Sequence, residues 1–267
     1  MIFCKELDKE FSDKEAMFAE LVETKKISID RRKSEVKTKR CSLSLMPSGE
    51  SSKSVASGGV EYGQTIFPVI NTTNYLDSHG DVHGKNIWNK SAKEQNGKVY
   101  FVVDHDLKFG SVISYPKDVN ILVKELPWSE LGRDYKGTTN ALIFETKINE
   151  YANKAYVEGL KNGMPIEHSI RMRYIDVELA VNSDKYEEEY KVWKETIDLV
   201  ANKDEATEIG YFYYVKQAAI VMEGSAVLFG SNDATPRLES VKDIEPSGDT
   251  HDKQEGVKNA PVWLNLM

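Results

Sequence analysis

One short stretch, from residue 166 to residue 174, alternates strictly between apolar and polar side chains. A period of two is typical of a β-strand with one buried face. It places Ile170, Met172 and Tyr174 on one face, and Ser169, Arg171 and Arg173 on the other. Such a strand needs neighbouring strands and a core to cover its apolar face, so the stretch predicts a sheet.

Several other runs are rich in β-branched and aromatic residues, which favour strands. Together with the alternating stretch they predict strands at Thr65–Asn71, Val99–Asp104, Val119–Leu126, Thr139–Thr146, Glu167–Ile175, Tyr211–Gln217 and Ala219–Phe229. Seven short strands with few helices favour a compact, β-rich α+β fold, and we predict a closed or partly closed β-barrel with a few surrounding helices.

Two helices are expected within this part of the chain. The first covers Glu150–Lys161 and should end at Asn162-Gly163, because glycine is a common helix stop. The second covers Asp184–Val200, with Asp184 as its cap and Glu187 completing a capping box. Its apolar stripe consists of Tyr186, Tyr190, Trp193 and Ile197.

The ends of the chain differ from its middle in composition. Residues 1–60 combine a predicted amphipathic helix over 1–26, a basic run at Lys25–Arg40, and a Ser- and Gly-rich linker at Ser42–Gly59. Residues 61–236 carry the predicted strands, with a charged helical insert at about 176–208. Residues 237–267 read as a flexible polar tail ending in the apolar group Val262-Trp263-Leu264. The basic run reads as a solvated tail.

Composition limits the classes of function. At 267 residues and 40% hydrophobic, the chain can form one substantial core. A net charge of −8 disfavours a general nucleic-acid binder. Cys4 and Cys41 suggest no disulfide framework, and neither a signal peptide nor a bilayer-spanning stretch is evident. We expect a protein of a reducing cytoplasm, or of a particle assembled there.

Two residues suit the two halves of a nucleophile–base pair. His105 lies at the end of the apolar run Val99–Val103, and Ser169 shares its strand face with Arg171 and Arg173. A serine hydroxyl becomes a good nucleophile when a base such as histidine takes its proton. The anionic intermediate then needs positive charge or amide donors nearby. His168, next to Ser169, should point to the opposite face and pack in the core or against another subunit.

Several segments, in order, resemble the prohead (capsid-maturation) serine proteases of tailed bacteriophages, which are similar in fold to the herpesvirus assemblins. The resemblance covers about residues 64–236. It is carried by Tyr75–Val82, by Val103–Asp106 with Phe109-Gly110, by Ala152–Gly163, by His168-Ser169-Ile170, by Met222–Val227 and by Gly230–Ala234.

The resemblance implies a catalytic set. Ser169 would be the nucleophile, His105 the general base and Glu223 the carboxylate that orients it, while Asp104, Asp106 and Asp81 are alternative carboxylates. Backbone amides near Ile170 and Arg171, or an arginine such as Arg171 or Arg173, would hold the oxyanion. No cofactor or metal is required.

The resemblance also implies partners and a place of action. The substrates would be the major capsid protein and the scaffold protein, and the protease would trim its own ends. It would act in the host cytoplasm, inside the assembling procapsid, and could form a homo-oligomer. Neither a membrane nor nucleic acid is expected as a partner.

Two departures from the family pattern leave alternatives open. Arg171 stands where the family has a glycine after the Ser-Ile pair, and the charged insert separates Ser169 from Glu223 more widely than usual. One alternative is therefore a catalytically inactive capsid-assembly or scaffolding module with a protease-like fold. A lesser alternative is a zinc-dependent hydrolase that uses His79, His83 and His105.

Overall fold

Two β-sheets form the centre of the molecule in the computed structural model, which describes residues 1–36, 55, 56 and 58–241. In the five-stranded sheet, β10 (Tyr211–Val227) pairs along one edge with β9 (Glu167–Val181). Along its other edge it pairs with β4 (Asp81–His83) and then β5 (Tyr100–Val103), which is followed by β6 (Val112–Ser114). The four-stranded sheet has the order β11 (Arg237–Leu238), β3 (Thr65–Thr72), β8 (Thr138–Lys147) and β7 (Val119–Pro127).

The two sheets pack on each other but do not join into a barrel. Their inner faces share one hydrophobic core, in which the ring of Phe144 from β8 meets that of Phe101 from β5 edge to face. Gly224 of β10 lies so close to Phe144 that a Cβ atom would clash. The predicted barrel was therefore wrong in its closure, although the α+β, β-rich composition is correct. Closure requires hydrogen bonds between the edge strands of the two sheets, and the described residues form none.

The strand predictions were largely correct in position, with one informative difference. The two strands predicted at 211–217 and 219–229 form the single strand β10. The predicted break falls where β10 shifts register against β9, between Gln217 and Ala218. A second irregularity lies between Ile220 and Gly224. Bulges such as these bend a strand without ending it.

Helices cover the sheets and connect the strands. They are α3 (Asn89–Gln95), α4 (Lys154–Lys161), α5 (Glu187–Thr196) and α6 (Lys203–Ile209), with short 3₁₀ turns at Phe109–Ser111, Pro116–Asp118, Trp128–Leu131 and Ile197–Leu199. The helix α4 begins at Lys154 instead of the predicted Glu150 and ends at Lys161. Asn162 is its C-cap and Gly163 follows with a φ of 65°, so the predicted stop is correct.

The charged insert differs from its prediction at both ends. The strand β9 continues to Val181, so the insert begins as strand, and its helical part ends with α6 at Ile209. The helix α5 begins at Glu187, and Tyr186 rather than Asp184 is its N-cap. Its stripe behaves as expected, because Trp193 is buried and its ring lies 5.2 Å from that of Phe212 in β10. The insert is thus a cover for the sheet.

The N-terminal residues form a packed unit instead of the single helix predicted over 1–26. A hairpin of β1 (Ile2–Cys4) and β2 (Lys9–Phe11) turns at Asp8, and the helices α1 (Lys14–Glu23) and α2 (Lys25–Ser34) follow. Asp13 caps α1 by accepting a hydrogen bond from the amide of Ala16. Phe11, Phe18 and Leu21 of this unit belong to the main hydrophobic core.

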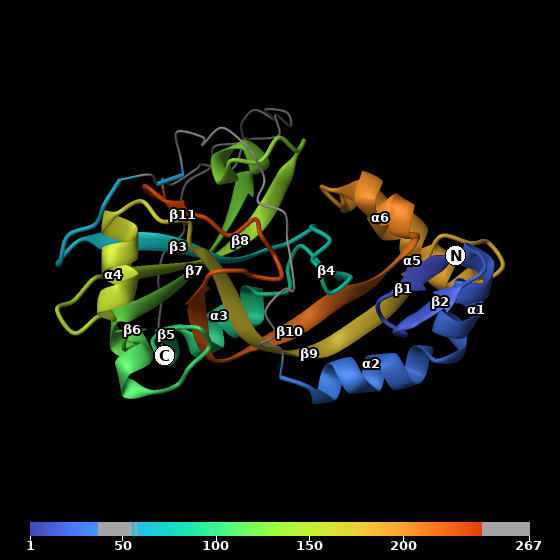
Figure 1. Cartoon of the computed structure of the whole chain (residues 1–267), viewed down its shortest axis with the longest axis horizontal. Helices are drawn as coiled ribbons and strands as arrows, with labels where there is room; N and C mark the ends of the chain where they lie inside the picture. The colour runs from blue at the N-terminus through green and yellow to red at the C-terminus, as the bar shows by residue number, and fades with distance from the viewer. Residues whose placement is uncertain (37–54, 57, 242–267) are drawn as a thin grey trace, which may run out of the picture.

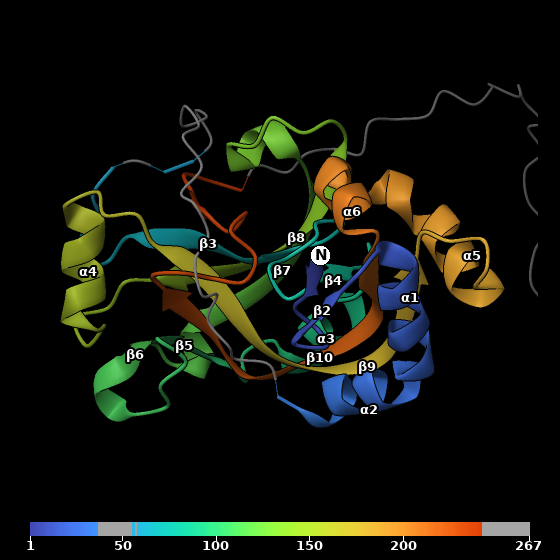
Figure 2. The ribbon, with the colours of Figure 1, turned by 45° about the vertical axis from the view of Figure 1, so that its right-hand side comes forward.

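This N-terminal unit lies at one end of the molecule, and His105 and Ser169 lie near the other end, where β5 ends and β9 begins. In Figures 1 and 2 the elements α1 and α2 flank one end of β9 and β10, while β5, β6 and α4 lie at the other end. The remainder of the basic run, Cys41 and residues 242–267 lie outside the described residues. Residue 236 does not bound the fold, because β11 pairs with β3. No helix in the described part of the chain is long and apolar enough to span a bilayer.

Candidate functional site

A histidine and a buried glutamate meet where β5 and β10 end side by side. His105 Nδ1 lies 2.8 Å from Glu223 Oε1, and the two side chains are 6% and 0% exposed. The second oxygen of Glu223 has no hydrogen-bond partner among the described residues. A buried carboxylate normally satisfies both oxygens, and the bond to His105 is the one that Oε1 forms here. The bond to Nδ1 fixes the orientation of the ring, so a reacting group would have to meet the ring at Nε2.

The backbone around this pair adopts an unusual conformation. Asp104, His105 and Met222 are three of the five non-glycine residues with positive φ in the described chain, at 56°, 54° and 64°. Such residues cost about 1–3 kcal/mol each and persist where surrounding structure enforces them, often at functional sites. Here the enforcement includes Ser225 Oγ, which accepts a hydrogen bond of 2.9 Å from the amide of His105.

Ser169 lies on β9, on the far side of β10 from His105. Its register partner is Ser225, so the two serines face the same side of the sheet about 5 Å apart, as directly opposed residues do. Ser169 and His105 thus flank Ser225 from either side. The described residues show no hydrogen bond between Ser169 Oγ and His105. Catalytic hydrogen bonds are often long in a free enzyme and tighten when substrate binds.

The alternative carboxylates are engaged elsewhere. Asp106 accepts a hydrogen bond of 2.9 Å from Ser111 Oγ and pairs with Lys108, which braces the loop after β5. Asp104 is exposed, and its backbone lies in the left-handed region. Asp81 lies in the other buried network described below. Of the four carboxylates considered, Glu223 is the one that bonds His105.

The alternation of β9 positions its other residues as predicted. His168 is buried on the opposite face from Ser169, where Nδ1 lies 2.8 Å from the carbonyl oxygen of Thr235. Burial lowers the pKa of His168 to about 4, so the ring is neutral at physiological pH. A neutral ring that bonds a core carbonyl has a structural role.

Ile170 and the two arginines complete the row beside Ser169. Ile170 is buried in the core, so only its backbone could serve an oxyanion. Arg171 is half-buried, opposite the bulge that carries Met222, and its Nε has no hydrogen-bond partner among the described residues. Arg173 is exposed. Arg171 is therefore the arginine placed to act near Ser169.

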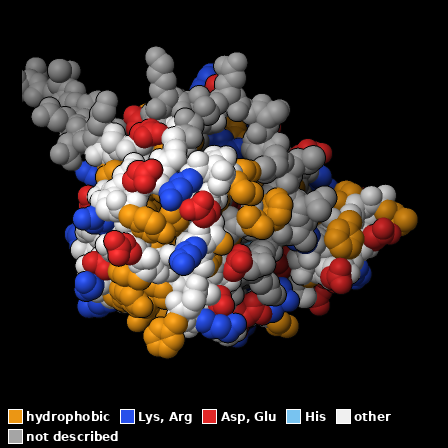
Figure 3. All heavy atoms as spheres, turned by 60° about the vertical axis from the view of Figure 1, so that its left-hand side comes forward, with side chains coloured by type: hydrophobic (Ala, Val, Ile, Leu, Met, Phe, Trp, Pro, Cys, Tyr) orange, Lys and Arg blue, Asp and Glu red, His pale blue; other side chains and the backbone are white. Residues whose placement is uncertain are grey.

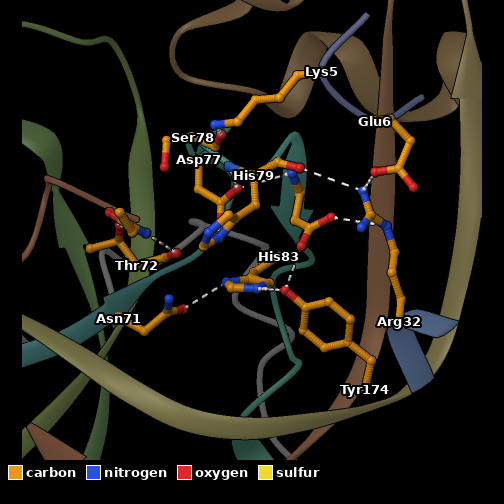
Figure 4. Close-up of polar contacts among 12 residues, drawn as sticks. Lys5, Glu6, Arg32, Asn71, Thr72, Asp77, Ser78, His79, His83 and Tyr174 are labelled. Atoms are coloured by element: carbon orange, nitrogen blue, oxygen red, sulfur yellow. Dashed lines mark hydrogen bonds and ion pairs between the residues drawn. The ribbon is translucent and has the colours of Figure 1, made fainter. Parts of the chain in front are cut away.

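His79, His83 and Asp81 belong to a second polar network at the N-terminal unit. His83 bonds Asn71 through Nδ1 and Tyr174 through Nε2, and Tyr174 donates to Asp81 (Figure 4). Asp81 also pairs with Arg32 from α2. Both ring nitrogens of His83 are thus already used. His105 bonds Glu223 instead, and the described residues contain no cluster of three metal-binding side chains. The geometry gives the zinc alternative no support.

Asp77 in this network should make stability depend on pH. Burial, followed by the charge of Asp81, raises the pKa of Asp77 to about 8. The folded protein then keeps a proton that the unfolded chain releases above about pH 4. The stability that this proton supplies is complete below pH 4 and is lost as the pH rises towards 8.

We expect Asp77→Asn, which mimics the protonated acid, to be increasingly more stable than the wild type from pH 5 to pH 8. Urea unfolding of both proteins at each pH measures the difference, in which titrating groups that do not interact with Asp77 cancel. Parallel curves over this range would show that Asp77 is ionised in the folded state.

Comparison with known proteins adds no relative: no family model, curated protein or solved structure matches the chain. The candidate site therefore depends on its own geometry. Sequence reasoning overlooked Ser225 as the anchor of the His105 amide, although its spacing two residues after Glu223 put both on one strand face. It also overlooked Arg32, which was assigned to a solvated run.

Proposed function

We propose that this chain is a serine endopeptidase that cleaves capsid and scaffold proteins during assembly of a tailed-bacteriophage head, in the host cytoplasm and inside the procapsid. The observation that carries the proposal is the His105–Glu223 pair beside Ser169, on strained backbone at one end of the sheet. The order of motifs that resembles prohead proteases supplies the substrate class.

The chemistry follows from these positions. Ser169 Oγ attacks the peptide carbonyl carbon while its proton passes to His105 Nε2, and Glu223 stabilises the resulting imidazolium. The tetrahedral intermediate collapses when His105 returns the proton to the leaving amine, which leaves an acyl-enzyme. Water, activated by the same histidine, then releases the acid. Backbone amides near Ile170 or the side chain of Arg171 would hold the oxyanion.

A fluorophosphonate probe tests the proposal on the purified full-length protein. The probe should label one residue, Ser169, as located by peptide mass spectrometry, and labelling should require His105. Co-expression with the capsid and scaffold proteins of a tailed bacteriophage that encodes this chain, followed by intact-mass measurement, should show shortened products. Absence of both labelling and shortened products would favour the inactive scaffolding module instead.

A substitution of Arg171 distinguishes the proposed active protease from the inactive scaffolding module. If its guanidinium holds the oxyanion, Arg171→Gly should slow acylation by about 10–1000-fold, the range for losing one such donor. If Arg171 obstructs a decayed site, the same change should raise the rate. The matched control is Arg173→Gly, which makes the same change two residues along the same face but at an exposed position. An equal, unchanged labelling rate in both variants would leave Arg171 without a role.

A further inference from the structure

The topology brings three loops to the end of the sheet that carries the candidate site. Because β5 and β10 are parallel, with Val103 beside Ala226, the loops that follow them leave the sheet side by side. The strand β9 is antiparallel to β10 and begins at Glu167 opposite Val227, so the segment that leads into β9 arrives at the same end.

These three segments expose large apolar side chains. Leu107 and Phe109 follow β5, Leu228 and Phe229 follow β10, and Met164 precedes β9; we call this set the apolar rim. Phe109 is 92% exposed and Leu228 63%. Figure 3 turns this end of the molecule forward and shows hydrophobic side chains gathered between charged ones. Grouped apolar side chains on a surface mark a place where another molecule binds.

The loop that presents Phe109 is held in place on both sides. Asp106 accepts from Ser111 at 2.9 Å, and Asn153 Nδ2 donates to the carbonyl oxygen of Gly110 at 2.8 Å. The amide of His105 is bonded to Ser225. Phe109 is thus exposed on a braced turn that already carries the candidate base, and it packs into no core. A rigid exposed aromatic of this kind loses little entropy when a partner covers it.

The register sets the distance from the rim to the nucleophile. Ser225 lies opposite Ser169, and Leu228 is three residues further along β10. At about 3.3 Å per residue, Leu228 lies about 10 Å from Ser169 along the strand direction. An extended peptide with its scissile bond at Ser169 would therefore place a side chain three or four positions away on the rim.

We propose that the apolar rim binds large aliphatic or aromatic side chains of an extended peptide substrate, within about four positions of the cleaved bond. This inference rests on the proposed endopeptidase function and specifies its substrates. Continuity between the rim and the candidate site argues for the substrate as the occupant rather than a separate protein.

The test compares the wild type with the rim variant Phe109→Ser/Leu228→Ser and the control variant Ile27→Ser/Leu199→Ser. The control alters two exposed apolar residues, in α2 and in the 3₁₀ turn after α5. Circular dichroism and thermal unfolding establish that each variant folds. Each protein then cleaves a library of proteome-derived peptides, with new termini read by mass spectrometry, and is separately labelled with a small fluorophosphonate.

We expect wild-type cleavage sites to be enriched in large apolar residues within four positions. The rim variant should lose about 10–100-fold in kcat/KM for these peptides, as expected for lost apolar contacts, while its Ser169 labels normally and the control is unchanged. Unselective cleavage, or equal kcat/KM in the rim variant, overturns the inference alone. Absence of labelling and cleavage in every protein overturns the proposed function and the inference together. A wild-type dimer that the rim variant abolishes in sedimentation, with cleavage unchanged, assigns the rim to self-association and also overturns it.

Discussion

Ser169→Ala is expected to abolish peptide cleavage, with a loss of about 10⁴-fold or more, while the protein stays folded. The reason is that the side chain is only half-buried, forms no hydrogen bond within the described residues, and leaves no cavity when its hydroxyl is removed. Intact-mass measurement of the cleaved substrate gives the rate. Ser231→Ala is the matched control, because it removes another half-buried serine hydroxyl, at a residue whose carbonyl oxygen accepts a hydrogen bond from the amide of Ser78. Normal cleavage by Ser169→Ala would remove it as the nucleophile.

His105→Ala should cause a similar loss, and the double variant should be little worse than either single one, because the proposed mechanism makes the two residues one unit. Losses that multiply would show that they act independently. Glu223→Gln extends the argument. The side-chain amide of the new glutamine can donate to His105 Nδ1, so the proton of the neutral ring moves to Nε2. A protonated Nε2 cannot accept the proton of the serine. The activity should fall steeply, and ¹⁵N spectra should report the changed tautomer.

The local parts of the site could be read from the sequence, and the long-range parts could not. The alternation around Ser169 settles which residues share its face, and it correctly turned His168 inward. The left-handed backbone at Asp104 and His105 was not predictable, because neither residue requires it and the hydrogen bond to Ser225 comes from 120 positions away. The prediction of a closed barrel was wrong because closure also depends on contacts distant in sequence. No local pattern shows whether the edge strands of two sheets meet.

The N-terminal unit shows the largest such failure. A charged run at residues 25–40 is usually solvated, yet Arg32 is 4% exposed. Its guanidinium bonds Glu6 Oε2 at 2.7 Å, pairs with Asp81 and lies over the ring of Tyr213 at 3.8 Å. Each partner comes from a different part of the chain. Which basic residue of such a run is buried therefore depends on partners distant in sequence, and the residues next to it in the chain do not reveal them.

Arg32→Met is expected to lower the free energy of unfolding by about 3–5 kcal/mol, because it removes the arginine that pairs with the buried carboxylate of Asp81 and one of the two arginines that bond Glu6. The matched control is Arg31→Met. Arg31 also bonds Glu6, but its side chain is 52% exposed, so its loss should cost about 1 kcal/mol or less. Urea unfolding of both variants measures the difference, and equal stabilities would mean that Arg32 contributes little to holding the N-terminal unit.

The same pair of variants tests the self-trimming that the proposed function implies. Cleavage in the Ser- and Gly-rich stretch at 42–59 would cut the covalent link between the N-terminal unit and the rest of the chain. Because that unit packs into the main core and is held by Arg32, we expect the N-terminal fragment, which contains residues 1–36, to stay bound after the cut. Engineering a specific protease site at residues 48–52 and cutting it should give two fragments that co-elute in the wild type and in Arg31→Met. They should separate in Arg32→Met, whereas separation in all three proteins would show that this end can be trimmed away, as the sequence alone predicted.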